Sequence, residues 1–271
     1  MNDLSLSGVS AERTARALSD HPWLERLARI GFAASGLLHL VIGGVAAQVA
    51  LGGRGEADQG GALEALRDAP GGQMLLWVCV VGFAALALWQ ALDAVLGGGE
   101  AKDRFKAAGK ALLYGALGAT SLTFALGGGG DSSESSADLT AALMGMPLGR
   151  LLVGAVGLAV IAAGGYHVYK GLAKRFLDDL QPTADDGGPV GATVVGSGMV
   201  GYVAKGVALA IVGGLFVLAA ATADPERSTG LDGALKLLAQ QPLGGALLLA
   251  VAVGLVLFGV YSFTRARFAD L

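Results

Sequence analysis

Charged side chains are scarce in this sequence. Asp, Glu, Lys and Arg make up 15% of its 271 residues, whereas 54% are apolar. Soluble domains carry about 25% charged residues, so a soluble bundle of buried helices is disfavoured. The net charge of −3 is also small, and we expect no nucleic acid partner because such proteins present basic surfaces.

Patterns that carry chemistry are equally scarce. Cys79 is the single cysteine, so no disulfide can form within one chain. A lone thiol inside an apolar run is typical of packing. The sequence contains no HExxH, GxSxG, Walker or CxxC motif, which are the usual signs of hydrolytic, nucleotide-binding and redox sites. We therefore expect no enzyme activity, no catalytic residue, no metal site and no cofactor.

Long apolar runs are what the sequence does contain. Each is long enough to cross the ~30 Å hydrocarbon core of a bilayer as a helix. Backbone groups in lipid must be hydrogen-bonded within their own helices, so the sequence predicts an all-α, polytopic integral membrane protein with six transmembrane helices. The predicted spans are 30–51, 72–96, 105–126, 149–169, 199–221 and 243–263.

One stretch occurs three times. A proline, one further residue and a glycine precede an apolar run at Pro70, Pro147 and Pro242. Nineteen residues beyond each proline is an aromatic side chain, which we interpret as an interface anchor or a stacking platform for a ligand: Trp89, Tyr166 and Tyr261. Agreement at several offsets without gaps indicates an internal repeat.

These signals divide the chain into three tandem two-helix repeats, which we expect to pack as a pseudo-threefold bundle. The repeats cover 29–98, 104–176 and 199–268, with a cytosolic or interfacial arm at 1–28 and a cytosolic loop at 177–198. A short amphipathic segment before each repeated proline is expected to lie as a helix in the membrane interface.

Residues four apart lie on one face of a helix, and in each odd span such a face carries polar residues followed by a glycine, as at Ser35, His39 and Gly43 of the first span. Helices in lipid associate through small residues that let their backbones approach closely. We expect helix–helix contacts at the repeat-equivalent positions Gly43, Gly118 and Gly213.

Basic residues are unevenly distributed between the two sides of the predicted bundle. Of the 19 Lys and Arg residues, 14 fall in the N-terminal arm, the two connections between repeats and the C-terminus, or within a few turns of them. Cytoplasmic segments carry the excess of Lys and Arg. The sequence therefore predicts a multi-pass protein with both termini in the cytoplasm.

The repeat motifs resemble those of a bacterial membrane family known only as domain of unknown function 1206, over about residues 27–268. The matching stretches are Gly31-Phe32 to Gly36, Ala107 to Ala111, Gly201-Tyr202 to Gly206, Ala62-Leu63 to Gly72, Ala142-Leu143 to Gly149 and Ala234-Leu235 to Gly244. The resemblance implies three two-helix repeats in a bacterial plasma (inner) membrane, and it brings no reaction. Ser35 stands where the family usually has a basic residue.

Polar side chains recur near the cytosolic ends of the spans and form a predicted ligand- or lipid-binding collar. An unpaired charge in hydrocarbon costs about 2.5–3.5 kcal/mol on insertion scales. Asp93 is the one acid expected at this level, so the basic residues are expected to need phosphate, unless they merely snorkel to the headgroups. The predicted site residues are Lys110, Lys170, Lys205, Arg265, Asp93, Gln90, His167, Ser262, Ser35 and His39.

Three functions stay open at this point. The first is a non-enzymatic protein that binds membrane lipids, anionic ones included, or a membrane-protein partner through the collar. The alternative is a small-solute or anion channel or transporter through the pseudo-threefold axis. A haem-binding or redox subunit is less favoured, because His39 and His167 are expected to differ by roughly 8 Å in depth at ~1.5 Å per residue.

The topology can be tested by labelling. In a Ser133→Cys variant the thiol is expected to react with a membrane-impermeant reagent from outside the cell, and in an Asp185→Cys variant it is not. The control is the same pair of variants in lysed cells, where both should react. Labelling of intact cells in the reverse order would contradict the positive-inside argument.

Overall fold

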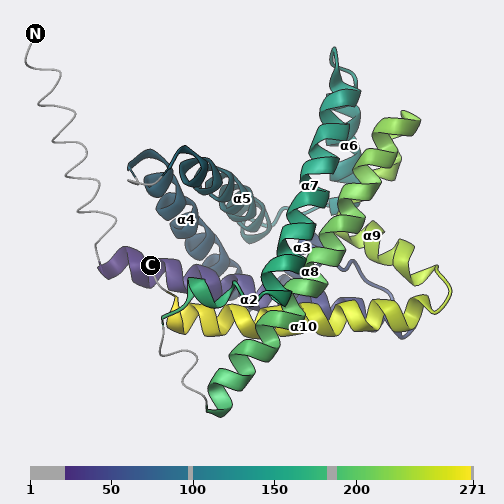
Figure 1. The fold of residues 1–271 in the computed structure, drawn as a ribbon. Coiled ribbons are helices and arrows are strands. Elements are labelled where there is room, and N and C mark those ends of the chain that lie inside the picture. Colours follow the sequence, from purple (N-terminus) through teal and green to yellow (C-terminus); the bar gives the residue numbers. More distant parts are fainter. Residues whose placement is uncertain (1–21, 97–99, 182–187, 270–271) are drawn as a thin grey trace, which may run out of the picture.

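A computed structural model describes residues 22–96, 100–181 and 188–269. Most of the predicted N-terminal arm, part of the 177–198 loop and Asp185 therefore lie outside the described residues. Within the described ranges the chain is all-α, apart from an isolated bridge between Leu180 and Ala269. The helices, shown in Figure 1, are α2 (Pro22–Ala50), α3 (Gln59–Asp68), α4 (Gly72–Leu96), α5 (Ala101–Ala125), α6 (Ser132–Met144), α7 (Gly149–Leu172), α8 (Pro189–Thr222), α9 (Gly230–Ala239) and α10 (Gly244–Phe268), with 3₁₀ turns η1 (Leu177–Asp179) and η3 (Pro225–Arg227).

Five helices of the described chain are long and apolar enough to cross a membrane: α2, α4, α7, α8 and α10. The sixth predicted span forms α5, which has the same length as α4 but carries more charge. Four basic residues and Asp103 lie in its first ten positions. The prediction of an all-α chain with long apolar helices is confirmed, and α5 is the helix that composition alone does not place among the spans.

The short helices predicted before each repeated proline are present as α3, α6 and α9. The residue after each proline, Gly71, Leu148 or Leu243, has a positive φ of 75°, 62° or 62°. The glycine that follows packs against the C-terminal end of the preceding short helix. At Gly149 an added Cβ would strike the carbonyl oxygen of Leu143. The repeated motif is therefore a tight reversal that leads the chain from the short helix into the next long one.

The long helices form three antiparallel pairs, and each pair joins the second helix of one repeat to the first helix of the next. Figure 1 shows α4 beside α5, α7 beside α8, and α10 beside α2. The last pairing returns the final helix to the first one. In the same view the α7–α8 pair runs across the α2–α10 pair, so the long helices are not all parallel.

Glycines set the approach of the two helices in two of these pairs. A Cβ added at Gly164 of α7 would lie 2.6 Å from the carbonyl oxygen of Gly206 in α8. A Cβ at the repeat-equivalent Gly259 of α10 would lie 2.8 Å from the carbonyl oxygen of Gly36 in α2. In the α4–α5 pair the equivalent positions hold alanines, Ala87 and Ala111.

The predicted glycine contacts are confirmed. A Cβ at Gly43 would lie 2.8 Å from the carbonyl oxygen of Ala252, and one at Gly213 would lie 2.6 Å from that of Gly157. Gly118 also faces a neighbouring helix, but its nearest neighbours would be 3.6 Å away, which is an ordinary van der Waals distance with room for a methyl group.

The two helices of one repeat also touch in repeats one and three, and in these a glycine lies at the contact. A Cβ at Gly31 of α2 would strike the carbonyl oxygen of Gly82 in α4, and one at Gly201 of α8 would lie 2.6 Å from the Cα of Phe258 in α10. The equivalent residue of repeat two is Lys106, which is exposed. In that repeat α5 and α7 barely touch, because a lysine cannot allow the backbone approach that glycine allows.

Adjacent glycine pairs provide matched tests of this packing. Gly43→Ala and Gly213→Ala should each lower the melting temperature in detergent, because overpacking costs about 1–3 kcal/mol. Gly44→Ala and Gly214→Ala have nothing within 4 Å of the new methyl group, and they should be neutral or stabilising by up to about 1 kcal/mol through helix propensity. Equal melting temperatures within each pair would show that these faces do not meet another helix.

Candidate functional site

A cavity of about 930 Å³ lies among the long helices. Its walls come from α2, α4, α5, α7 and α8, and they are mainly apolar, as at Leu38, Ile42, Phe83, Leu117 and Val160. Small-molecule sites in proteins commonly occupy about 300–1,000 Å³ and combine apolar walls with a few placed polar groups. The volume and the walls both suit an apolar ligand of substantial size.

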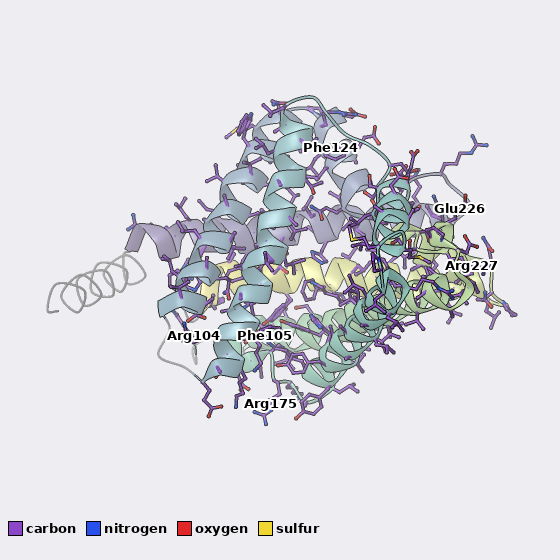
Figure 2. The ribbon with its side chains drawn as sticks, turned by 90° about the horizontal axis from the view of Figure 1, so that it is seen from above. Arg104, Phe105, Phe124, Arg175, Glu226 and Arg227 are labelled. Carbon is purple, nitrogen blue, oxygen red and sulfur yellow. The ribbon has the colours of Figure 1, made fainter. Side chains whose placement is uncertain are left out.

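The cavity is open on one side. Helices α5 and α7 both contribute residues to its lining, yet they barely touch each other. Figure 2 labels Phe105 and Phe124 at opposite ends of α5, and the lining residues of this helix run from Leu113 to Phe124. Many of the exposed side chains on both helices are large and apolar.

Four predicted site residues meet at one end of the cavity: Ser35, His39, His167 and Lys205. The Nδ1 atom of His39 lies 2.7 Å from the carbonyl oxygen of Ser35, and that of His167 lies 2.8 Å from the carbonyl oxygen of Ala163. A carbonyl only accepts hydrogen bonds, so both Nδ1 atoms carry the hydrogen. These bonds fix both rings and leave Nε2 of each imidazole for a ligand.

Lys205 is the cation of this end of the cavity. Its Nζ lies 4.2 Å from the centre of the Phe258 ring, and the ammonium acts electrostatically on both imidazoles. No carboxylate in the described ranges pairs with it. A cation–π contact is worth about 0.5–2 kcal/mol, or somewhat more when desolvated, but it supplies no negative charge, so the ammonium still lacks an anion.

The opposite end of the cavity is lined by hydroxyl groups of α6 and by Asp58, which lies just before α3. Asp58 is only 4% exposed and accepts a hydrogen bond from the amide of Gly61 at 3.0 Å. Burial raises the pKa of this carboxyl group. Its role as the N-cap of α3 explains its position.

An aromatic cluster packs against the two histidines at the Lys205 end of the cavity. The rings of Phe176, Tyr202, Phe258 and Tyr261 pack with centroids 5.2–6.2 Å apart. His39 packs on Phe258 at 4.6 Å and His167 on Tyr202 at 5.7 Å. Tyr261 is 1% exposed and donates a hydrogen bond to the carbonyl of Phe176 at 2.9 Å, so its interpretation as an interface anchor is wrong.

Asp179 neutralises two of the predicted collar residues. Its carboxylate lies 2.6 Å from Nζ of Lys170 and 3.7 Å from a guanidinium nitrogen of Arg265. The expectation that only Asp93 is available to the collar is therefore wrong, because η1 folds a second acid back over the helix ends. The sequence offers one signal for this ion pair, the acidic residues Asp178 and Asp179 shortly after Lys170. The prediction of a loop at 177–198 assigned them no partner.

The remaining predicted site residues do not join the cavity. Lys110 and Asp93 are exposed, and no ion pair of the described residues joins them. Ser262 is buried and donates to the carbonyl of Phe258 at 2.8 Å. Gln90 is half-buried, and its side-chain oxygen has no hydrogen-bond partner within the described chain. The predicted ring thus divides into a cavity group, an Asp179 group and isolated side chains.

Comparison with known proteins identifies a family and a similar bacterial protein. The family described as Domain of Unknown Function (DUF1206) matches three times, over residues 30–97, 105–174 and 200–269. The chain is 29% identical over 257 residues to the uncharacterized protein YxxB of Bacillus subtilis (strain 168), covering 92% of this chain and 93% of that protein. No solved structure matches the chain.

The role of Asp179 can be separated from that of its neighbour. Asp179→Asn should lower the free energy of unfolding by about 1.5–3 kcal/mol, the usual worth of hydrogen bonds to charged groups, since Lys170 would lose its half-buried partner. Asp178→Asn removes only an exposed pair with Arg175, which solvent screens, and it should therefore have a much smaller effect. Thermal melting in detergent compares them, and equal losses would show that Asp179 does not hold the helix ends together.

Proposed function

We propose that this chain, which belongs to the DUF1206 family, is a non-enzymatic protein of the bacterial plasma membrane that binds an anionic lipid in its central cavity. In this proposal the chain crosses the bilayer six times, as three tandem two-helix repeats, with both termini in the cytoplasm. Five long apolar helices support a membrane location, and the Bacillus relative supports a bacterial one.

The sixth crossing is α5, and its packing supports this assignment. α5 is as long as α4 and lies along it as an antiparallel partner, as α8 does with α7 and α2 with α10. Its charged residues lie in its first half, where long basic side chains can reach the headgroups. Figure 2 shows Arg104 and Arg175 toward one end of the molecule and Glu226 and Arg227 toward the other.

Lys205 is the observation that carries the lipid proposal. An ammonium inside an apolar cavity is expensive unless an anion or water accompanies it. Lys170 and Arg265 have Asp179, whereas Lys205 faces the cavity without a carboxylate partner among the described residues. A bound lipid phosphate would supply the missing charge, and the apolar walls would hold an acyl chain.

The shape of the site favours lipid over a transported solute. The gap between α5 and α7 gives access from the side of the molecule, which suits a ligand that arrives within the membrane. The aromatic cluster of Phe176, Tyr202, Phe258 and Tyr261 lies between the cavity and the cytosolic helix ends. A conducting path along the axis would have to pass through these packed rings.

The position of Lys205 also argues against a redox centre. Two imidazoles that share a cavity are potential ligands of haem iron, although counting residues along α2 and α7 placed them at different depths. The Lys205 ammonium acts on both of them and would repel an iron cation between them. The same charge favours an anion.

The role of Lys205 in lipid binding can be tested with the equivalent residue of repeat two, Lys110, as the control. Lys205→Gln should lower the retention of phosphatidylglycerol in native mass spectra by about tenfold, since a hydrogen bond to a charged group is worth about 1.5–3 kcal/mol. Lys110→Gln changes the equivalent residue of repeat two, which is exposed, and should have little effect. Retention of the neutral lipid diacylglycerol should change in neither variant.

Two outcomes would contradict the proposal. If Lys205→Gln retains the anionic lipid as the unmodified protein does, the cavity does not use this cation. If Lys110→Gln loses as much lipid as Lys205→Gln, the lipid binds through a diffuse surface charge and not in the cavity.

A further inference from the structure

The two cavity histidines favour a ligand that can donate hydrogen bonds, in addition to the negative charge that Lys205 favours. Both imidazoles use Nδ1–H to donate to a backbone carbonyl one turn earlier, at 2.7 Å for His39 and 2.8 Å for His167. In the neutral ring with this tautomer, Nε2 carries a lone pair and accepts a hydrogen bond. No described residue donates to Nε2 of either ring. The cavity therefore presents two acceptors beside one cation.

The acceptors and the cation line the same cavity and pack on neighbouring aromatic rings. His39 packs on the ring of Phe258, and Nζ of Lys205 lies 4.2 Å from the centre of the same ring. His167 packs on Tyr202, whose ring lies 5.2 Å from that of Phe258. The three polar groups are thus gathered around one aromatic cluster.

We propose, building on the lipid-binding function above, that the ligand is a phospholipid whose headgroup carries free hydroxyl groups beyond the phosphate. The phosphate accepts from Lys205, and the hydroxyls donate to Nε2 of His39 and of His167. The phosphoglycerol headgroup has this chemistry: one negative charge and two hydroxyl donors. A buried acceptor left without a donor costs about 1–3 kcal/mol, and this gives the site its selectivity.

Other anionic or zwitterionic ligands satisfy the site less well. A deprotonated fatty acid offers acceptors alone and leaves both imidazoles without donors. An ethanolamine headgroup brings donors, but its ammonium would lie next to that of Lys205 and be repelled. A divalent metal ion meets the same repulsion, and the described residues contain no cluster of three His, Cys, Asp or Glu side chains that would hold one.

A pair of lipids that differ only in hydroxyl groups tests the inference. Phosphatidylglycerol and phosphatidylmethanol with identical acyl chains have the same charge, but phosphatidylmethanol has no hydroxyl donor. In competition in nanodiscs, read out by native mass spectrometry, the unmodified protein should retain phosphatidylglycerol about tenfold over phosphatidylmethanol. A factor of this size corresponds to one or two net hydrogen bonds.

Variants then assign the selectivity to the histidines. His39→Phe combined with His167→Phe should reduce the preference to about onefold while the retention of phosphatidylmethanol stays unchanged. Lys205→Gln should lower the retention of both lipids. The comparison on the unmodified protein needs no variant, so it remains decisive if the double variant fails to fold.

The outcomes separate this inference from the function on which it rests. Equal retention of the two lipids by the unmodified protein, both lowered by Lys205→Gln, would overturn the hydroxyl requirement and leave the lipid site in place. Equal retention that Lys205→Gln does not change would overturn both. A preference that survives the double histidine substitution would assign the hydroxyl contacts to other residues and overturn the role of the imidazoles.

Discussion

The close backbone approach of one helix to the first helix of the next repeat is the contact on which the rest of the structure depends. Helices surrounded by lipid gain little from burying apolar side chains against each other, so they depend on packing at short range. Gly164 against Gly206 and Gly259 against Gly36 supply that packing at equivalent positions. These pairs hold α2, α7 and α8, three of the helices that line the cavity, and so place His39, His167 and Lys205 in its wall.

Much of the local structure can be predicted from the sequence because the same pattern of residues occurs in three repeats. The proline–glycine motif predicts where the second long helix of each repeat begins, the segment before it predicts each short helix, and the repeated glycines predict the helix contacts. A signal that recurs at equivalent positions leaves little room for coincidence. The all-α class and the family follow from the same repeated residues.

The candidate site was harder to predict, because its members come together only through tertiary packing. Depth counted along a helix assumes that all helices stand upright, whereas Figure 1 shows the α7–α8 pair crossing the α2–α10 pair. His39 and His167 can therefore line one cavity despite different distances from their helix ends. The ion pairs of Asp179 were not predicted because this residue belongs to a connection between helices. The loose packing of α5 against α7 was not predicted because Lys106, in place of a glycine, resembles an ordinary surface lysine.

The pairing of α10 with α2 has a consequence for the assembly of the chain. Synthesis proceeds from the N-terminus, so α4 can pair with α5, and α7 with α8, soon after the second helix of each pair has been made. α2 must wait beside them until nearly the whole chain has been synthesised, because its main partner is the last helix. Its glycine face, which includes Gly36 and Gly43, lacks its partner α10 throughout that interval.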